Sequence, residues 1–349
     1  MEKVVYVLGA GFSAPLGLPV MTNFILRAKD MYFKDKTKKY EYFKEIFDLL
    51  DGMSKIKNYF SSDLYNIEEV LSVLEMNDYL NGSNNSEKFK KFISDVIRYY
   101  TPEVKEYPVA LPGNWQDYVF GAASPIQKYY GSFVANLLGV KVSMKKEDRT
   151  LIWESVKNDV KYSVVSFNYD LVLESYVDYF KKTGEISEDT GFNVDNIELA
   201  PNQTILSKLH GCVNKKNIVP PTWNKYSNQE LITVWENAWN EIKNANHIRI
   251  IGYSLPVSDS YIKYFLKSCV YGSDHLKSID VLTLDKSVNE EVRIRYEEFI
   301  DFNYFRFKNA NFVDYVKFLS DEQYKGVGIS TECIHFNELE VAHEVFMDS

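Results

Sequence analysis

The sequence has few cysteines, no excess of basic residues and no long apolar run. Its three cysteines, Cys212, Cys269 and Cys333, are far apart and form no CxxC pair, so they supply neither a disulfide framework nor a cysteine zinc site. With 40 basic and 49 acidic residues the net charge is −9, which disfavours broad binding to a nucleic-acid backbone. No stretch approaches the roughly 18 consecutive apolar residues of a membrane span, and the first residues are strand-like rather than a signal peptide. We therefore expect a cytoplasmic protein that contacts neither a membrane nor nucleic acid directly.

The apolar content of the chain is sufficient for a full core. Hydrophobic residues make up 45% of the 349 positions, and only 10 positions are proline. This composition excludes a disordered or fibrous chain. The length suits two structural units, or one large α/β unit with an insertion.

The order of the expected elements predicts an α/β fold, a Rossmann-like doubly wound parallel sheet with a large helical insertion after the first βα unit. Strands are expected at Lys3 to Leu8, Tyr162 to Phe167, Ile205 to Leu209, His247 to Ile251 and Ile279 to Leu284. From Lys39 to Asp159 the chain shows helical patterns, including one that begins after a cap expected at Asn66, and no convincing strand. We therefore assign residues 1–35 and 160–319 to the Rossmann-like domain and residues 36–159 to the helical module. Residues 320–349 are weakly patterned and acidic, and their role is open.

A glycine loop follows the first strand. Gly9, Ala10, Gly11, Phe12, Ser13 and Ala14 fit the pattern GxGxxA, in which glycines let the backbone approach a diphosphate and the next helix supplies amide donors. The same glycines also suit a plain tight turn, so the motif alone does not distinguish a diphosphate-binding loop from a structural turn. The acidic residue that ends the second strand of dehydrogenases is missing, because Asp30 lies within a helical pattern. An ordinary hydride-transfer domain is therefore disfavoured.

Polar residues also follow the later strands. Because ligands bind at the carboxyl ends of parallel strands, the candidate site consists of residues at these positions: Asn168 and Asp170, His210, Gly252 and Ser254, and Asp285. Taken singly, an asparagine is more often a cap and a histidine more often a packed side chain. Two roles stay open for Asp170: orienting the site, and capping the helix that it begins. Their shared position at one edge of the sheet favours a site.

Four ordered motifs resemble the sirtuin-like family. They are GAGFS with a following GLP (Gly9 to Ser13 and Gly17 to Pro19), NYD (Asn168 to Asp170), LHG (Leu209 to Gly211) and GYSLPVSD (Gly252 to Asp259). Their order and spacing, with the loop Val219 to Trp223, are closer to bacterial sirtuin-like NAD-cleaving proteins than to the deacylases. Deacylating sirtuins carry an Asp-Phe-Arg run where Val20 to Thr22 stand here, and a four-cysteine zinc module that this chain cannot build.

The resemblance implies an NAD+ hydrolase that produces nicotinamide and ADP-ribose. Asn168 would position water or the ribose hydroxyls, and His210 would act as a general base. Gly9, Ala10, Gly11 and Ser13 would hold the diphosphate, and Ser254 with Asp285 would lie on the adenosine side. Phe12, Asp170 and Gly252 are also expected to bind the cofactor. No metal is expected, since no His/Cys/Asp cluster has ligand spacing and cleavage of this bond needs no Lewis acid.

Two further functions stay open. One is an NAD-dependent protein deacylase or ADP-ribosyltransferase, and the other is a non-catalytic sensor of NAD or ADP-ribose. The family resemblance also implies a role in antiphage defence by NAD depletion, with an ATPase or a phage protein as partner. We expect a homo-oligomer that forms through the aromatic-rich helical module.

Overall fold

The structure is a computed structural model of the whole chain. It describes residues 1–105, 115–121, 126–144, 151–155, 160–183, 186–194, 202–214, 218, 229–257, 259–324 and 339–349.

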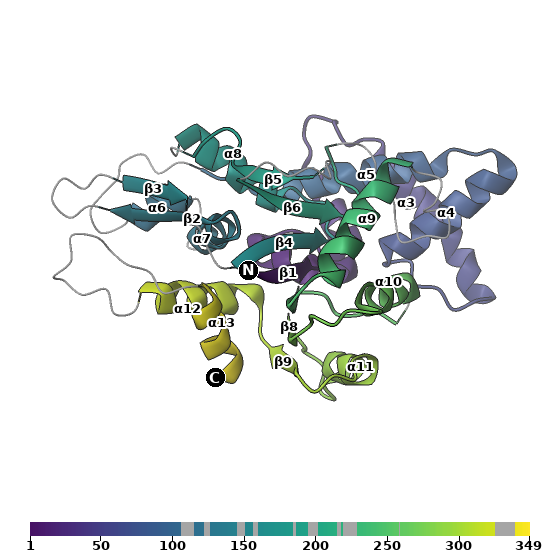
Figure 1. The fold of residues 1–349 in the computed structure, drawn as a ribbon. Helices are drawn as coiled ribbons and strands as arrows, with labels where there is room; N and C mark the ends of the chain where they lie inside the picture. Colours follow the sequence, from purple (N-terminus) through teal and green to yellow (C-terminus); the bar gives the residue numbers. More distant parts are fainter. Residues whose placement is uncertain are drawn as a thin grey trace.

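A seven-stranded parallel sheet forms the centre of the molecule (Figure 1). In spatial order its strands are β5 (Gly191–Asn193), β6 (Gln203–Lys208), β4 (Val160–Ser166), β1 (Glu2–Leu8), β7 (His247–Ile251), β8 (Ser278–Thr283) and β9 (Phe305–Asn309). Every neighbouring pair is parallel. The expected α/β class is confirmed, and the five expected strands are all present. The two edge strands, β5 and β9, were not expected from the sequence.

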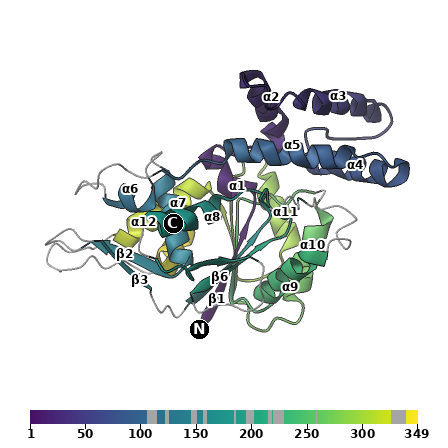
Figure 2. The ribbon, with the colours of Figure 1, turned by 90° about the horizontal axis from the view of Figure 1, so that it is seen from above.

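Helices cover both faces of this sheet, as a doubly wound fold requires (Figure 2). From Val4 to Leu8, the residues of β1 have no exposed surface. Val5 and Val7 pack into one hydrophobic cluster with α9 (Gln229–Lys243), α10 (Ser260–Val270) and α11 (Glu291–Phe299). The alternate residues pack into a second cluster with α7 (Gln127–Leu137), α8 (Val172–Thr183), α12 (Phe312–Tyr324) and α13 (Leu339–Asp348). No helix within the described ranges is long and apolar enough to span a bilayer.

The strand order reverses around β1. The chain places β4 on one side of β1 and returns later to place β7 on the other side. Leu8 of β1 lies beside Ser166 of β4 and Ile251 of β7, so the loops after these three strands leave the sheet next to one another. In parallel sheets this switch point is where ligands bind.

A helical lobe stands at this carboxyl edge (Figure 2). It consists of α2 (Phe24–Lys34), α3 (Phe43–Met53), α4 (Ile67–Asn81) and α5 (Asn85–Tyr100). Its core contains stacked aromatic side chains, with the Phe43 and Phe92 ring centroids 4.6 Å apart. The expected cap at Asn66 is confirmed, because its Oδ1 accepts hydrogen bonds from the backbone N–H of Glu68 at 3.0 Å and of Glu69 at 3.2 Å.

The expectation that residues 39–159 contain no strand is wrong. β2 (Val140–Met144) pairs with β3 (Leu151–Ser155) in a separate antiparallel sheet. These strands are five residues each, too short for alternation to stand out from the sequence around them. Moreover, α7 packs against the main sheet rather than in the lobe, since Phe133 makes an edge contact with Tyr6 of β1 at 5.2 Å between centroids. Among the described residues, the short helical segments are α1 (Ala10–Ser13), α6 (Trp115–Phe120) and 3-10 turns at 14–16, 21–23 and 54–58.

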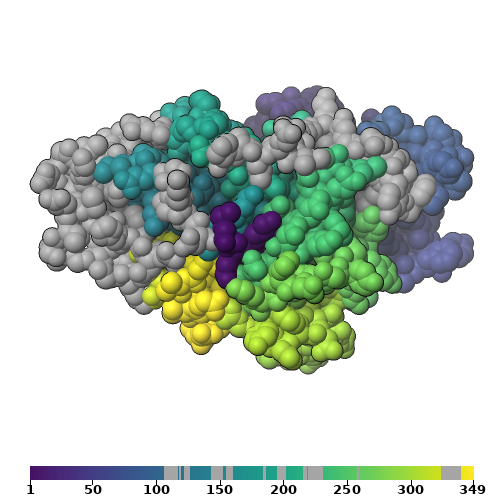
Figure 3. All heavy atoms as spheres, in the orientation of Figure 1, coloured from purple at the N-terminus to yellow at the C-terminus, as the bar shows by residue number. Residues whose placement is uncertain are grey.

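The C-terminal helix α13 is held by buried charges. Arg249, in the middle of β7, is 1% exposed, and its guanidinium donates two hydrogen bonds to the Glu340 carboxylate at 2.9 and 2.6 Å. His343 Nε2 contacts Asp280 Oδ2 at 3.0 Å. Figure 3 shows this helix (yellow) at the surface beside the first residues of the chain (purple). The residues from 339 onward, which had no assigned role, therefore complete the core of the sheet.

Candidate functional site

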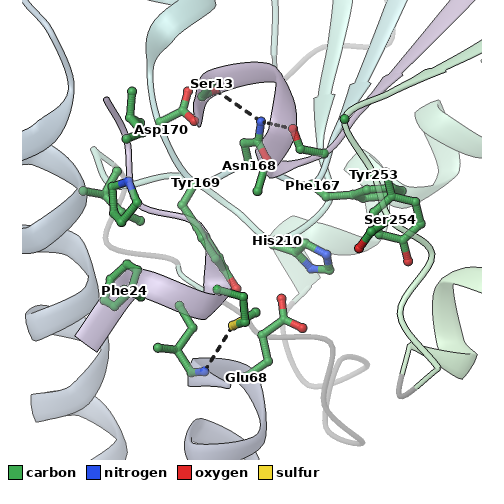
Figure 4. Close-up of a pocket in the computed structure, with 18 of the residues that line it drawn as sticks. Ser13, Phe24, Glu68, Phe167, Asn168, Tyr169, Asp170, His210, Tyr253 and Ser254 are labelled. Atoms are coloured by element: carbon green, nitrogen blue, oxygen red, sulfur yellow. Dashed lines mark hydrogen bonds between the residues drawn. The ribbon is translucent and has the colours of Figure 1, made fainter. Parts of the chain in front are cut away.

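A cavity of about 170 Å³ lies at the carboxyl edge of β1, β4 and β7 (Figure 4). Of the residues expected from the sequence to form the site, those that line this cavity are Gly9, Ala10, Ser13, Asn168, Asp170, His210, Gly252 and Ser254. Gly11, Phe12 and Asp285 do not line it. The structure therefore brings together residues that follow four of the five expected strands. Asp285, which follows the fifth expected strand, does not reach the cavity.

The glycines of the first loop pack against another backbone. Gly9 N donates to Ile251 O at 2.9 Å, and Gly11 N donates to Gly252 O at 2.8 Å. A Cβ on Gly11 would lie 2.7 Å from the Cα of Gly252, and a Cβ on Gly9 would lie 2.7 Å from the Cα of Tyr253. Gly252 itself has φ +66°, a conformation that favours glycine. These glycines thus join the loops after β1 and β7, and only Gly9 and Gly252 also face the cavity.

Phe12 and Asp285 have structural roles. The Phe12 ring is 1% exposed and lies 4.5 Å from the Phe312 ring, within the core. Oδ1 of Asp285 accepts a hydrogen bond from the Ser287 N–H in the loop before α11 at 3.0 Å, and Oδ2 accepts one from the Val292 N–H in the first turn of α11 at 2.8 Å. These bonds lower the pKa of Asp285 against the effect of partial burial, which raises it. Asp285 therefore caps a helix, and the structure does not bring it to the predicted adenosine side of the cavity.

Asn168 is buried and oriented by the glycine loop. Its Nδ2 donates to Gly9 O at 2.9 Å and to Ser13 Oγ at 3.4 Å, as the dashed lines in Figure 4 show. Because the carbonyl oxygen of Gly9 can only accept, the amide nitrogen of Asn168 must face it. The side-chain oxygen is then the atom of Asn168 that can accept a hydrogen bond from a ligand. Both hydrogen bonds of the Asn168 amide nitrogen go to the protein, so toward a ligand Asn168 offers an acceptor rather than a donor.

His210 follows β6 and reaches the cavity between aromatic rings. Its side chain is 2% exposed, and its ring centroid lies 5.8 Å from that of Phe167, 6.0 Å from Tyr169 and 6.4 Å from Trp235. The turn is fixed by Gly211, which has φ +75° and whose N–H donates to Lys208 O at 3.0 Å. This environment is apolar and water-poor, which strengthens electrostatic interactions with a charged ligand.

Asp170 lines the cavity and also caps α8. Its Oδ1 accepts a hydrogen bond from Val172 N at 3.1 Å. Burial raises the pKa of Asp170, while the positive charge of Lys208 and a hydrogen bond from Ser13 act in the opposite direction. Lys208 donates to the backbone oxygen of Asp170 and pairs with Glu174 at 3.0 Å. Asp170 therefore accepts a hydrogen bond from the first residue of α8 and also lines the cavity.

The turn after β7 is held by buried side-chain hydrogen bonds. Tyr253 donates its hydroxyl to Asp259 Oδ2 at 2.6 Å, and Tyr296 donates to the Tyr253 carbonyl at 2.7 Å. Leu255 is fully buried with φ +49°, an uncommon conformation for a branched residue that persists only where packing enforces it. The exposed Ser254 is thereby placed at the mouth of the cavity.

The sequence did not predict that the helical lobe and the loop before it form one wall of the cavity. The additional lining residues are Leu18, Pro19, Met21, Phe24, Ile67, Glu68, Ile97, Phe167, Tyr169, Tyr253, Pro256 and Asp259. Ile67 N contacts Met21 Sδ at 3.3 Å and so joins the first turn of α4 to the loop. The GLP, NYD and GYSLPVSD motifs include Leu18, Pro19, Tyr169, Tyr253, Pro256 and Asp259, whereas no local pattern marks Glu68 or Ile97. The loop Val219 to Trp223 lies outside the described residues.

Within the described part of the chain, one cluster has spacing that suits a metal ion, and it lies away from the cavity. It consists of Asp280, His343 and Glu344. Arg306 pairs with Asp280 at 2.7 Å and with Glu344 at 2.8 Å. The two carboxylates are therefore already neutralised by an arginine.

Together these features define an α/β protein with a ligand cavity at the switch point of a parallel sheet. Residues 162–308 match the family model described as the SIR2-like domain. The match confirms the sirtuin-like resemblance, and the chain therefore carries a SIR2-like domain that extends from β4 to β9.

Comparison with solved structures gives low overall similarity to Sir2 enzymes. A Sir2 complex with the inhibitor EX-527, 2′-O-acetyl-ADP-ribose and a deacetylated p53 peptide is 11% identical, with 92% of this chain and 93% of that chain covered and a TM-score of 0.32. A Sir2 bound to a propionylated peptide is 11% identical, with 92% of each chain covered and a TM-score of 0.35. A search of curated proteins gave no match.

Proposed function

We propose that the protein is a sirtuin-like NAD+ hydrolase that cleaves the bond between nicotinamide and ribose. The observation that carries this proposal is the placement of Asn168 and His210, from two different strand ends, in one buried cavity beside the glycine loop. The SIR2-like domain contains both residues. No Lys or Arg is among the described residues that line the cavity.

The reaction needs little nucleophilic push, because the leaving group departs as neutral nicotinamide. The electron pair of the N-glycosidic bond moves to the ring nitrogen, and the ribose becomes cation-like at its anomeric carbon. A water molecule then forms the new C–O bond and loses a proton. The protein must hold the sugar, exclude bulk water and admit a single acceptor.

The described side chains fit these tasks. The side-chain oxygen of Asn168 can accept a hydrogen bond from the attacking water or from a ribose hydroxyl, because its nitrogen is held by Gly9 O and Ser13. His210 is the side chain in this wall suited to remove a proton at neutral pH, since histidine ordinarily titrates near pH 6.5. The surrounding rings of Phe167 and Tyr169 keep the reacting atoms away from water.

Incubation of the purified protein with NAD+, followed by separation of the products, tests the proposal. Nicotinamide and ADP-ribose should appear in equal amounts and without a peptide. Nicotinamide release that occurs only with an acylated peptide would favour the deacylase. Transfer of labelled ADP-ribose to protein would favour the transferase, and tight binding without any cleavage would favour the sensor.

The wider biological role is inferred from the family resemblance. A hydrolase of this kind would deplete NAD+ and so could act in antiphage defence, with its activity restrained by assembly or by an ATPase or phage-protein partner. Expression in cells with and without phage challenge, with NAD+ measured in both, tests this role. Unchanged NAD+ after challenge would contradict it.

A further inference from the structure

A lysine is buried behind the wall of the cavity. Lys208 is the last residue of β6 and is 4% exposed. Alternate residues of a strand face the same side, and Leu206, two residues earlier, packs into the apolar cluster that contains residues of α7 and α8. A lysine at such a position must give up the hydration of its charge. Lys208 does not line the cavity itself, so its charge acts on the site through the residues around it.

The Lys208 ammonium joins the turn after β4 to the first turn of α8. Nζ donates one hydrogen bond to the backbone oxygen of Asp170 and another to Glu174 Oε1 at 3.0 Å. The second carboxylate oxygen of Glu174 is also buried, and it accepts no hydrogen bond from the part of the chain that the structure describes. A buried ion pair is often no more stabilising than an apolar pair of the same size. Stability alone therefore does not explain the lysine.

A chain of hydrogen bonds leads from Asp170 to Asn168 by way of Ser13 (Figure 4). Burial is the main cause that raises the pKa of Asp170, whereas the Lys208 charge and a hydrogen bond from Ser13 lower it. The Ser13 hydroxyl gives its only proton to the Asp170 carboxylate, so toward Asn168 its oxygen can only accept. Asn168 Nδ2 donates to that oxygen at 3.4 Å. The ionised carboxylate thereby helps to keep the nitrogen of Asn168 on the protein and its oxygen available to a ligand.

We propose that Lys208 is a positioning residue that supplies the counter-charge for the Asp170 carboxylate. Through Ser13, this carboxylate then fixes which atom of the Asn168 amide faces a ligand. A protonated carboxyl would accept the Ser13 hydroxyl more weakly, because hydrogen bonds to an ionised group are the stronger ones. The catalytic consequence rests on the proposed function, in which the Asn168 oxygen meets water or a ribose hydroxyl.

The test follows the titration of the Asp170 side chain in the free protein. NMR of protein labelled with ¹³C-aspartate observes the carboxyl groups over a range of pH, and Asp170→Asn assigns the signal. Two neutral variants, Lys208→Met and Lys208→Gln, are compared with the wild type and with Lys208→Arg, which retains the charge. Lys208→Gln also retains a hydrogen-bond donor.

Lys181→Met is the matched control. Like Lys208, Lys181 donates to a backbone oxygen and pairs with a carboxylate, in its case both of Glu188, at 2.7 and 3.9 Å. It stands in the last turn of α8 and does not line the cavity. The control therefore removes the same charge from the same kind of contact at a distance from the site.

The Asp170 titration midpoint should move to higher pH in both neutral variants, because the positive charge is lost while burial still favours the protonated form. The charged and titratable groups around Asp170 are Lys208 of β6, Glu174 of α8 and Tyr130 of α7, and across the cavity Glu68, Asp259 and His210. Of these, the variants change Lys208 alone. Lys208→Arg and Lys181→Met should titrate like the wild type. In the same pH series, the acidic limb of kcat for NAD+ cleavage should move to higher pH in the neutral variants, with KM little changed.

An Asp170 midpoint in folded neutral variants that equals that of Lys181→Met would overturn the inference. Neutral variants that no longer fold would overturn it as well, since Lys208 would then serve the fold rather than the site. The NMR titration needs no NAD+, so it tests the inference even if the protein proves not to be a hydrolase. A wild-type protein without cleavage would contradict the proposed function alone.

Discussion

Gly11 and Gly252 approach so closely that a Cβ on Gly11 would lie 2.7 Å from the Cα of Gly252. This contact brings the loop after β1 against the loop after β7. It assigns Gly11 a role in closing the site that does not depend on contact with a ligand.

We predict that Gly11→Ala and the larger Gly11→Val lower the stability of the protein, because a side chain there would meet backbone that cannot move aside. Overpacking of this kind costs about 1–3 kcal/mol. Gly52→Ala is the control, since a Cβ on Gly52 meets nothing within 4 Å and the residue lies in helix α3. Thermal unfolding should show a lower Tm for the Gly11 variants and an unchanged or higher Tm for Gly52→Ala. Gly11→Val with the wild-type Tm but without NAD binding would instead support a direct contact with the diphosphate.

Replacing Asn168 or His210 with Ala should remove most NAD+ cleavage. A general base contributes typically 10²- to 10⁴-fold to the rate, so His210→Ala should lower kcat by that factor with little change in NAD affinity. Single-turnover cleavage and equilibrium binding measure the two effects separately. His210→Ala that cleaves NAD+ at close to the wild-type rate would contradict the mechanism.

Asn168→Ala should differ from His210→Ala in stability. It removes the hydrogen bonds to Gly9 O and Ser13 Oγ and leaves a buried carbonyl without this donor, at a cost of about 1–3 kcal/mol. We therefore expect Asn168→Ala to lower both kcat and the unfolding midpoint in denaturant. An unchanged midpoint would show that these bonds do not hold the loop.

The buried histidine of α13 predicts a pH dependence of stability. Burial is the main cause that lowers the pKa of His343, to about 4, and the nearby Arg249 charge acts in the same direction. The lowered pKa of Asp280 keeps that carboxylate ionised, so His343 Nε2 donates to it and Nδ1 accepts from the Tyr315 hydroxyl at 2.8 Å. In this arrangement the folded protein holds His343 neutral.

Unfolding allows His343 to bind a proton near its ordinary pKa of 6.5. Between pH 6.5 and 4 the unfolded state therefore binds more protons, and the free energy of unfolding falls as the pH falls, by about 2–3 kcal/mol. His343→Gln should flatten this slope, whereas substitution of the exposed His275 should not. Denaturant titrations at a series of pH values measure the slope. A slope that is the same in His343→Gln and wild type would assign the pH dependence to other groups.

The lobe is expected to form the contact of a homo-oligomer. Phe33, Tyr59 and Phe60 are 80%, 81% and 74% exposed, and large exposed aromatic side chains are typical of protein contacts. We predict that light scattering detects a homo-oligomer and that Phe33→Ser combined with Phe60→Ser shifts it toward monomer. A wild-type protein that is monomeric at every concentration, with and without NAD, would contradict the prediction.

The sequence predicted the structure best where a feature depends only on residues that are close together in the chain. The apolar run of β1 and the cap at Asn66 were both predicted, because the strand and the helix start depend on neighbouring residues. The shared position of Asn168 and His210 followed from the parallel sheet alone. Each of these inferences needs only chain direction and hydrophobic pattern.

The remaining features depend on contacts between distant segments. An aspartate after a strand looks the same whether it binds a ribose or caps a helix, and Asp285 caps α11. The glycines of the first loop looked like a diphosphate loop, but their close neighbour is Gly252, which lies far along the chain. Glu68 reaches the site only because the lobe stands over the sheet edge. Arg249 and Asp280, charged residues within apolar strands, were the available signal that a further charged element such as α13 must cover them.

The central position of β1 has a consequence for how the protein is made. Glu2 to Leu8 pair with Val160 to Ser166 on one side, and Val4 to Leu8 pair with His247 to Ile251 on the other. During synthesis β1 therefore cannot complete its pairing until β7 has left the ribosome. Pairings between segments so far apart in the sequence make folding slow. Residues 162–308, although they match a domain family, lack the strand that separates β4 from β7. An expressed fragment with these limits would have two unpaired strand edges, and it should aggregate unless the first residues of the chain are supplied to it.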